Sequence, residues 1–222
     1  MTLSILARNS RTGAFGGAAA TGNLAVGGWV LRATADAGAV ATQGTSVSSI
    51  WGDEAIVRLR DRQAPSSIVE DLTGGDPGRE HRQLAVLGPE GAGAAWTGTE
   101  NRDAKGQLIG EGYVITGNWL ASTEVLAAME QAFTATAADP QAAFADRLLS
   151  ALAAGITAGG DARGTFSAAL LVVSPAAPPL DLRVDYDSMP LDTLRALYQR
   201  ATTPPYTEWI GRVPTLEDPT RC

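Results

Sequence analysis

Few side chains in this sequence could carry covalent or acid–base chemistry. The only cysteine, Cys222, is the last residue, and chain ends are poorly ordered, so we expect an incidental thiol there and not a preorganised nucleophile. The only histidine is His81, which excludes a zinc site with several His or Cys ligands but not a carboxylate site for a cation. His81 precedes an apolar strand-like run. It is typical of an imidazole at a strand edge, with a general base as the alternative.

Other candidates are polar residues at the ends of predicted strands or within glycine turns. Thr42 and Gln43 end an apolar run, so they either line a ligand-binding cleft or hydrogen-bond the loop that follows. Asp161 and Arg163 lie between glycines, a pattern typical of an ion pair in a structural turn. The polar run 101–103 is typical of a solvated loop.

Composition and charge limit the partners. The 222 residues carry 17 Lys and Arg against 24 Asp and Glu, a net charge of −7; without a basic surface for phosphates, we expect no nucleic-acid partner. The apolar residues are dispersed, without the run of about 18 that a membrane helix needs, and the first residues lack the basic region of a signal peptide. No P-loop or dinucleotide fingerprint follows a predicted strand. We therefore expect a cytoplasmic protein with no membrane partner, no cofactor and no metal site.

Strand signals come in hairpins, and helix signals come in pairs. The predicted strands are 3–7, 14–21, 38–43, 83–87, 94–97, 113–116, 166–173 and 180–184, with a further apolar stretch at 24–31 and a polar loop at 98–111. The predicted helices are 51–61, 65–74, 123–136, one that begins at Asp139 and Pro140 and ends before Gly155, and 191–198.

This order favours antiparallel sheets with helices on their outer faces over a doubly wound parallel sheet. We predict an α+β fold, a four-layer αββα sandwich of two mainly antiparallel sheets. Residues 1–202 are predicted to form a single domain, and residues 203–222 an extended tail rich in proline and aromatic residues, docked on the domain or on a neighbour.

Several ordered segments resemble the bacterial domain-of-unknown-function family 1028, which is similar in fold to N-terminal-nucleophile hydrolases. The segments are residues 2–8 with Thr12 and Gly13, 38–43, 76–83, 112–118, and 159–164 leading into 167–173. The chain departs from the family pattern at His81, where an aromatic residue is usual, and after Gly98, where a cysteine is often found.

The resemblance implies a chemistry for the start of the chain. In N-terminal-nucleophile hydrolases the first residue of the mature chain attacks an amide, and its own α-amino group accepts the proton. Thr2 would be that catalytic nucleophile after removal of Met1, because an α-amine with a pKa of about 7.7 to 8.0 is a suitable base near neutrality. Asn118 is then a candidate donor to the oxyanion, and Asp161 with Arg163 the candidate pair that tunes the amine.

Two functions from different classes remain open. The first is an amidohydrolase that acts on a small amide or peptide-like metabolite. The second is a non-catalytic ligand-binding or assembly module with the same fold. In either case we expect a small-molecule or peptide-like ligand, bound by Thr42, Gln43, Asn118, Asp161 and Arg163. The true N-terminus separates the two functions, and the aromatic tail favours a homo-oligomer.

Overall fold

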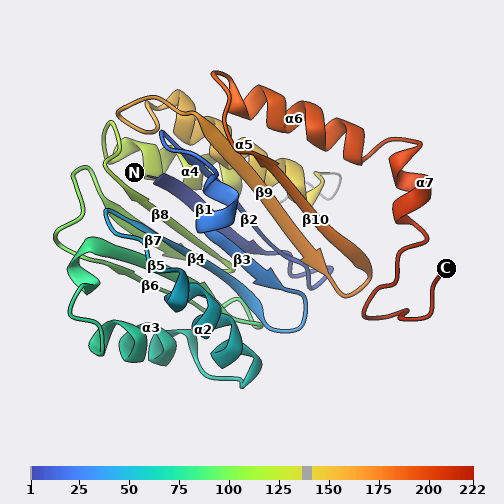
Figure 1. Ribbon diagram of the computed structural model, residues 1–222, viewed down its shortest axis with the longest axis horizontal. Helices are drawn as coiled ribbons and strands as arrows, with labels where there is room; N and C mark the ends of the chain where they lie inside the picture. The colour runs from blue at the N-terminus through green and yellow to red at the C-terminus, as the bar shows by residue number, and fades with distance from the viewer. Residues whose placement is uncertain (1, 137–141) are drawn as a thin grey trace.

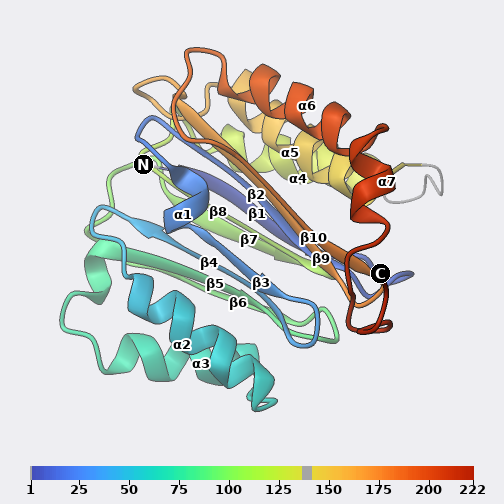
Figure 2. The same cartoon turned by 45° about the vertical axis from the view of Figure 1, so that its right-hand side comes forward.

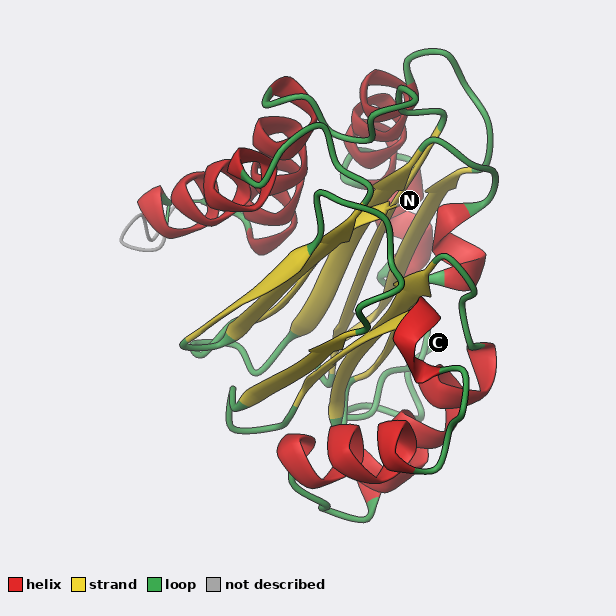
Figure 3. Cartoon of the chain, turned by 90° about the vertical axis from the view of Figure 1, so that its left-hand side faces the viewer, coloured by secondary structure: helices red, strands yellow, loops and turns green. Residues whose placement is uncertain are grey.

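The structure, a computed structural model, describes residues 2–136 and 142–222. Two β-sheets lie face to face, and helices cover the outer face of each, so that the chain forms four layers (Figure 3). Neighbouring strands in both sheets are antiparallel. The predicted αββα sandwich is confirmed.

The larger sheet contains β1 (Thr2–Arg8), β2 (Phe15–Thr21), β7 (Gly106–Gly110), β8 (Tyr113–Asn118), β9 (Ser167–Ser174) and β10 (Ala177–Val184). These strands lie in the order β10-β9-β2-β1-β8-β7. The smaller sheet contains β3 (Leu31–Thr34), β4 (Gly38–Gly44), β5 (Arg82–Leu87) and β6 (Gly93–Thr97), in chain order. The first strand of the chain thus lies inside the larger sheet, between β2 and β8.

The outer layers divide the helices between the two sheets. Helices α4 (Glu124–Ala135), α5 (Phe144–Thr157) and α6 (Pro190–Ala201) cover the larger sheet, and α2 (Ser49–Arg60) and α3 (Pro65–Gly74) cover the smaller one (Figures 1 and 2). The shorter elements are α1 (Val26–Trp29), the 3-10 helix η1 (Arg79–His81) and α7 (Tyr206–Ile210). Helix α3 begins at Pro65, since proline suits the first helical position, where no intrahelical N–H bond is needed.

The pleat of β1 decides which of its residues face which layer, because successive side chains of a strand point to opposite faces. Leu3 and Ile5 pack in the cluster under α4 and α5, whereas Leu6 packs in the cluster between the two sheets. By the same alternation, Thr2 and Ser4 face the smaller sheet.

Gly16 allows α5 to approach the larger sheet closely. A Cβ atom at Gly16 would lie 2.8 Å from Leu148 Cδ1 and 2.9 Å from the carbonyl oxygen of Leu171. Contacts of that length are repulsive, so a side chain here would push the helix or the neighbouring strand away.

Some segments differ from the sequence-based expectation. The predicted loop at 98–111 contains β7, which pairs with β8; its strand signal is weak because only Leu108 and Ile109 supply apolar side chains. The apolar stretch at 24–31 is not one strand, since it forms α1 and then enters β3. The helix start predicted at Asp139 and Pro140 lies outside the described residues.

The tail of residues 203–222 is not extended throughout, because α7 lies within it. The Glu217 amide donates a hydrogen bond to the carbonyl oxygen of Pro175 at 3.1 Å, which ties the tail to the turn between β9 and β10. The domain boundary after residue 202 stays a prediction. None of the described helices has the length and the apolar run that a bilayer crossing requires.

We expect Leu148→Ala to destabilise the protein by about 2–5 kcal/mol, because the side chain is fully buried between α5 and the larger sheet and its loss leaves a cavity. Urea-induced unfolding measures the change. Leu216→Ala is the matched control, since Leu216 is 63% exposed, and it should change the stability by less than about 0.5 kcal/mol. Equal effects of the two substitutions would contradict the burial of Leu148 between α5 and the larger sheet.

Tyr113 should ionise at a higher pH than an ordinary tyrosine. Burial, together with its 2.6 Å hydrogen bond to Glu130 Oε1, raises the pKa of the Tyr113 hydroxyl to about 12. The resulting stabilisation is fully present below about pH 10 and is lost as the pH rises through about 12. We expect Tyr113→Phe to remove the highest-pH part of the phenolate absorbance titration. An unchanged titration in this variant would show that the pKa of Tyr113 is not raised.

Candidate functional site

Thr2 lies where β1 begins, on the face of the larger sheet that meets the smaller sheet. It pairs with Asn118 of β8, and its Oγ1 donates a hydrogen bond to Thr21 Oγ1 at 3.3 Å. Thr2 is only 7% exposed. Three neighbouring strands, β2, β1 and β8, thus bring hydroxyl and amide side chains together at one end of the space between the sheets.

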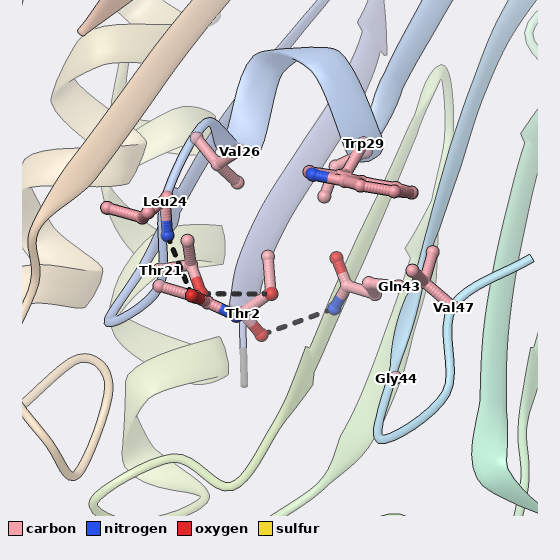
Figure 4. A pocket seen from close by; sticks show the side chains of 10 residues that line it. Thr2, Thr21, Leu24, Val26, Trp29, Gln43, Gly44 and Val47 are labelled. Carbon is pink, nitrogen blue, oxygen red and sulfur yellow. Dashed lines mark hydrogen bonds between the residues drawn. The ribbon is translucent and has the colours of Figure 1, made fainter. Parts of the chain in front are cut away.

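A cavity of about 400 Å³ opens beside Thr2 (Figure 4). Its volume is at the lower end of the range for small-molecule sites, about 300–1,000 Å³. The lining residues come from the start of β1, the end of β2, helix α1 with its flanks, and the end of β4 with the loop that follows: Thr2, Thr21, Asn23, Leu24, Val26, Trp29, Val30, Gln43, Gly44 and Val47.

Gln43 connects Thr2 to the smaller sheet. Its Nε2 donates to the carbonyl oxygen of Thr2 at 3.2 Å and to Gln83 Oε1 at 2.9 Å, while its Oε1 accepts from Ser4 Oγ at 2.7 Å. Ser4 in turn lies 2.9 Å from Thr116 Oγ1 on β8. Because all these side chains are buried, each hydrogen bond replaces one that water would otherwise supply.

Gln83 is the centre of this buried network. Its Oε1 accepts from Gln43 and, at 2.6 Å, from Asn118 Nδ2, while its Nε2 donates to the carbonyl oxygen of Gly117 at 2.8 Å and to Thr97 Oγ1 at 3.0 Å. The amide of Asn118 therefore points to Gln83 and is not among the groups that line the cavity. In this arrangement Asn118 supports the strand next to Thr2.

Asp161 and Arg163 form an ion pair, with Arg163 Nη2 3.3 Å from Asp161 Oδ2. The Asp161 side chain is fully buried and accepts hydrogen bonds from the backbone amides of Gly22 at 2.5 Å and Arg163 at 2.9 Å. Gly22 lies between Thr21 and Asn23, which both line the cavity. The pair thus holds the loop that forms part of the wall, and neither of its members lines the cavity.

Thr42 and Gln43 point to opposite faces of β4, so only one of them reaches the cavity. Gln43 faces the larger sheet. Thr42 Oγ1 donates to the carbonyl oxygen of Trp29 at 3.2 Å, and the Thr42 amide donates to that of Val30 at 3.0 Å. Thr42 therefore fixes the end of α1, which carries two of the lining residues.

Asn101 is a buried residue that fixes a loop, although its neighbours in the sequence are polar. It is only 2% exposed, although the run 101–103 is typical of a solvated loop. Its Oδ1 accepts from the Thr45 amide at 2.9 Å, and its Nδ2 donates to the carbonyl oxygens of Arg82 and Gly98 at 2.9 and 3.0 Å. Asn101 thus anchors the loop that carries Val47 to the cavity.

The sequence pattern indicates Thr2 and Gln43 as site residues, but neither the other lining residues nor Gln83. One signal was present: Gln43 and Gln83 are polar residues in otherwise apolar strands, and a buried amide needs a partner. The apolar lining residues gave no such signal, because they are indistinguishable from core residues. Among the described residues, no group of three or more His, Cys, Asp or Glu side chains could hold a metal ion. His81 and Cys222 are exposed and do not line the cavity.

The chain is similar to known proteins over nearly its whole length. The family model described as "Family of unknown function (DUF1028)" matches residues 2–194. The crystal structure of a DUF1028 protein from Silicibacter pomeroyi is 45% identical in sequence, with a TM-score of 0.93 over 99% of this chain and 98% of that one. The match to that structure therefore includes the tail, which the family model does not reach.

A more distant match is the crystal structure of eukaryotic HslV from Trypanosoma brucei. It is 13% identical, with a TM-score of 0.47 over 78% of this chain and 99% of that one. None of the curated proteins gives a significant match to this chain.

Gln83→Leu should destabilise the protein by roughly 2 kcal/mol or more, because it removes the acceptor of the buried Asn118 amide and of one of the two N–H groups of the Gln43 amide, at about 1–3 kcal/mol for each unpaired group. Urea-induced unfolding measures the loss. The control is Gln131→Leu on the exposed side of α4, which should be close to neutral. If both variants unfold at the same urea concentration as the wild type, the network does not hold the sheets together.

Proposed function

The chain belongs to the DUF1028 family, and within that family of unknown function we propose that it is an N-terminal-nucleophile amidohydrolase with Thr2 as its nucleophile. The substrate is a small amide or peptide-like metabolite. The observation that carries the proposal is the position of Thr2, the first residue of a central strand, with its side chain at a cavity between the sheets. A mechanism that uses the N-terminal residue needs that residue to be both ordered and accessible to a ligand.

In the proposed reaction, Thr2 Oγ1 attacks the carbonyl carbon of the amide, and the hydroxyl proton passes to the α-amino group of Thr2. The C–N bond then breaks, the departing amine takes up the proton, and an ester joins the acyl group to Thr2. Water hydrolyses this ester, again with the α-amine as base, and regenerates the hydroxyl. Removal of Met1 is a condition of this mechanism, because an amide nitrogen at Thr2 is not basic.

The contacts around Thr2 favour a fixed nucleophile. Gln43 holds the Thr2 carbonyl oxygen from the smaller sheet, while pairing with β8 holds the backbone within the larger sheet. Preorganisation of this kind lowers the entropic cost of bringing nucleophile and carbonyl together. Asn23 and the backbone at Gly44 also line the cavity, and we propose these groups as donors to the oxyanion in place of Asn118, whose amide is bonded to Gln83.

Thr2→Ala should abolish amide hydrolysis, with kcat lower by at least about 1,000-fold, because it removes the nucleophile but keeps the small residue that permits removal of Met1. The assay is release of p-nitroaniline from a panel of acyl and aminoacyl p-nitroanilides. Thr2→Ser is the matched control, since it keeps a hydroxyl, and it should retain measurable turnover. Intact-mass measurement of each untagged protein verifies that one methionine has been lost.

Retention of Met1 in protein from its native cells would rule out this mechanism, as would equal turnover by wild type and Thr2→Ala. Either result favours the non-catalytic ligand-binding or assembly module. Self-association through the tail and a cytoplasmic location stay predictions, which gel filtration and cell fractionation can test.

A further inference from the structure

The cavity beside Thr2 is lined by residues of two chemical types. Thr2, Thr21, Asn23 and Gln43 are polar, and the apolar wall consists of Leu24, Val26, Trp29, Val30 and Val47. Figure 4 shows the Trp29 indole across the cavity from Thr2, with Leu24 beside Thr21 and Val47 beside Gln43. An amide held at the hydroxyl of Thr2 would therefore have an apolar surface within reach of its substituent.

Hydrogen bonds fix the backbone of the segments that carry the apolar wall. The Thr42 hydroxyl holds the carbonyl oxygen of Trp29, and Asn101 holds the Thr45 amide two residues before Val47. The next amide, that of Ser46, donates to the carbonyl oxygen of His81 at 3.0 Å. Both segments that supply the apolar wall are thus anchored by buried hydrogen-bonding groups, so the wall has a defined shape.

Two of the wall residues are unusually exposed for their type. Leu24 is 57% exposed and Trp29 is 52% exposed, although both are large and apolar. A bound apolar group would remove their surface from water and gain hydrophobic stabilisation. The exposure is therefore a feature that a ligand can use.

Charge is absent from the lining. Of the residues that the structure describes, those that line this cavity are all uncharged. A charged substituent would lose hydration on entry and meet no side chain of opposite charge in the lining, which is unfavourable. The α-amine of Thr2 carries no charge in the form that acts as the base. The same cavity would accept an uncharged group at no such cost.

From these observations we infer that the group of the substrate that enters this cavity is uncharged and apolar, with the bulk of a branched aliphatic or phenyl side chain. Val47 and Trp29 determine this selectivity. The inference rests on the proposed function, because it names the substrate class of the same site, an amide whose acyl portion carries the apolar group.

Binding and hydrolysis of four amides test it separately. N-acetyl-L-leucinamide, N-acetyl-L-phenylalaninamide, N-acetyl-L-aspartamide with a free side-chain carboxylate, and N-acetyl-L-lysinamide are titrated into full-length Thr2→Ala protein by calorimetry. We expect the leucine and phenylalanine amides to bind at least about ten-fold more tightly than the aspartate and lysine amides. Hydrolysis of the same amides by the wild type is the separate test of the proposed function.

Val47→Asp, made in the same Thr2→Ala protein, should weaken binding of the apolar amides by about ten-fold and strengthen binding of the lysine amide. Ile50→Asp is the matched control, because it adds the same charge nearby at a side chain that is 71% exposed and outside the lining; it should leave the affinities unchanged. Trp29→Ala, at a half-exposed position, provides a second variant in case Val47→Asp does not fold. It should weaken binding of the apolar amides and leave binding of the charged amides unchanged.

The outcomes separate the two ideas. Equal affinities for the four amides, no binding by any of them, tighter binding of the charged pair, or no effect of either wall variant would overturn the inference. Selective binding without hydrolysis by the wild type supports the inference and overturns the proposed function. Hydrolysis that prefers a charged amide does the reverse.

Discussion

The buried hydrogen bond between Gln43 and Gln83 is the interaction on which the site depends. Two sheets that pack face to face normally meet through apolar side chains, and one end of this interface does so, through residues such as Leu6, Val114 and Leu87. At the other end the pleat turns hydroxyl and amide side chains inward. Buried polar groups cost free energy unless they are paired, so the two glutamines must lie where they satisfy one another and the strands beside them.

This requirement links Thr2 to both sheets. Gln43 contacts the carbonyl oxygen of Thr2, and Gln83 contacts Asn118, the residue that Thr2 faces on the next strand. The first residues of most chains fray, but here Thr2 is held by Gln43 of the smaller sheet and by pairing with β8 in the larger sheet. Asp161 and Asn101 also fix backbone through buried side chains, since each accepts a hydrogen bond from an amide of a loop that lines the cavity.

The sequence predicts the layers well and the site only in part. Hairpin spacing and paired helices are local patterns, so the αββα sandwich could be predicted from them, whereas β7 carries too few apolar residues to be seen. Thr42 and Gln43 are neighbours in sequence, yet the period of two in a strand sends them to opposite faces, and which face meets the cavity depends on the other sheet. Asn101 could not be recognised because its burial depends on residues 45 and 82, which only the tertiary fold brings to it.

Stability alone does not account for this polar network. Where a hydrogen bond joins two of its side chains, replacing both by apolar residues of similar shape can be nearly neutral or stabilising, because both partners are removed. The loss of one of the two leaves an unpaired buried group. Local rules of core packing tend to be broken at functional sites. Here the polar side chains lie at the end of the intersheet space where a cavity opens beside Thr2. The positioning of Thr2 at the cavity therefore explains the polar end of the sandwich better than a gain in protein stability does.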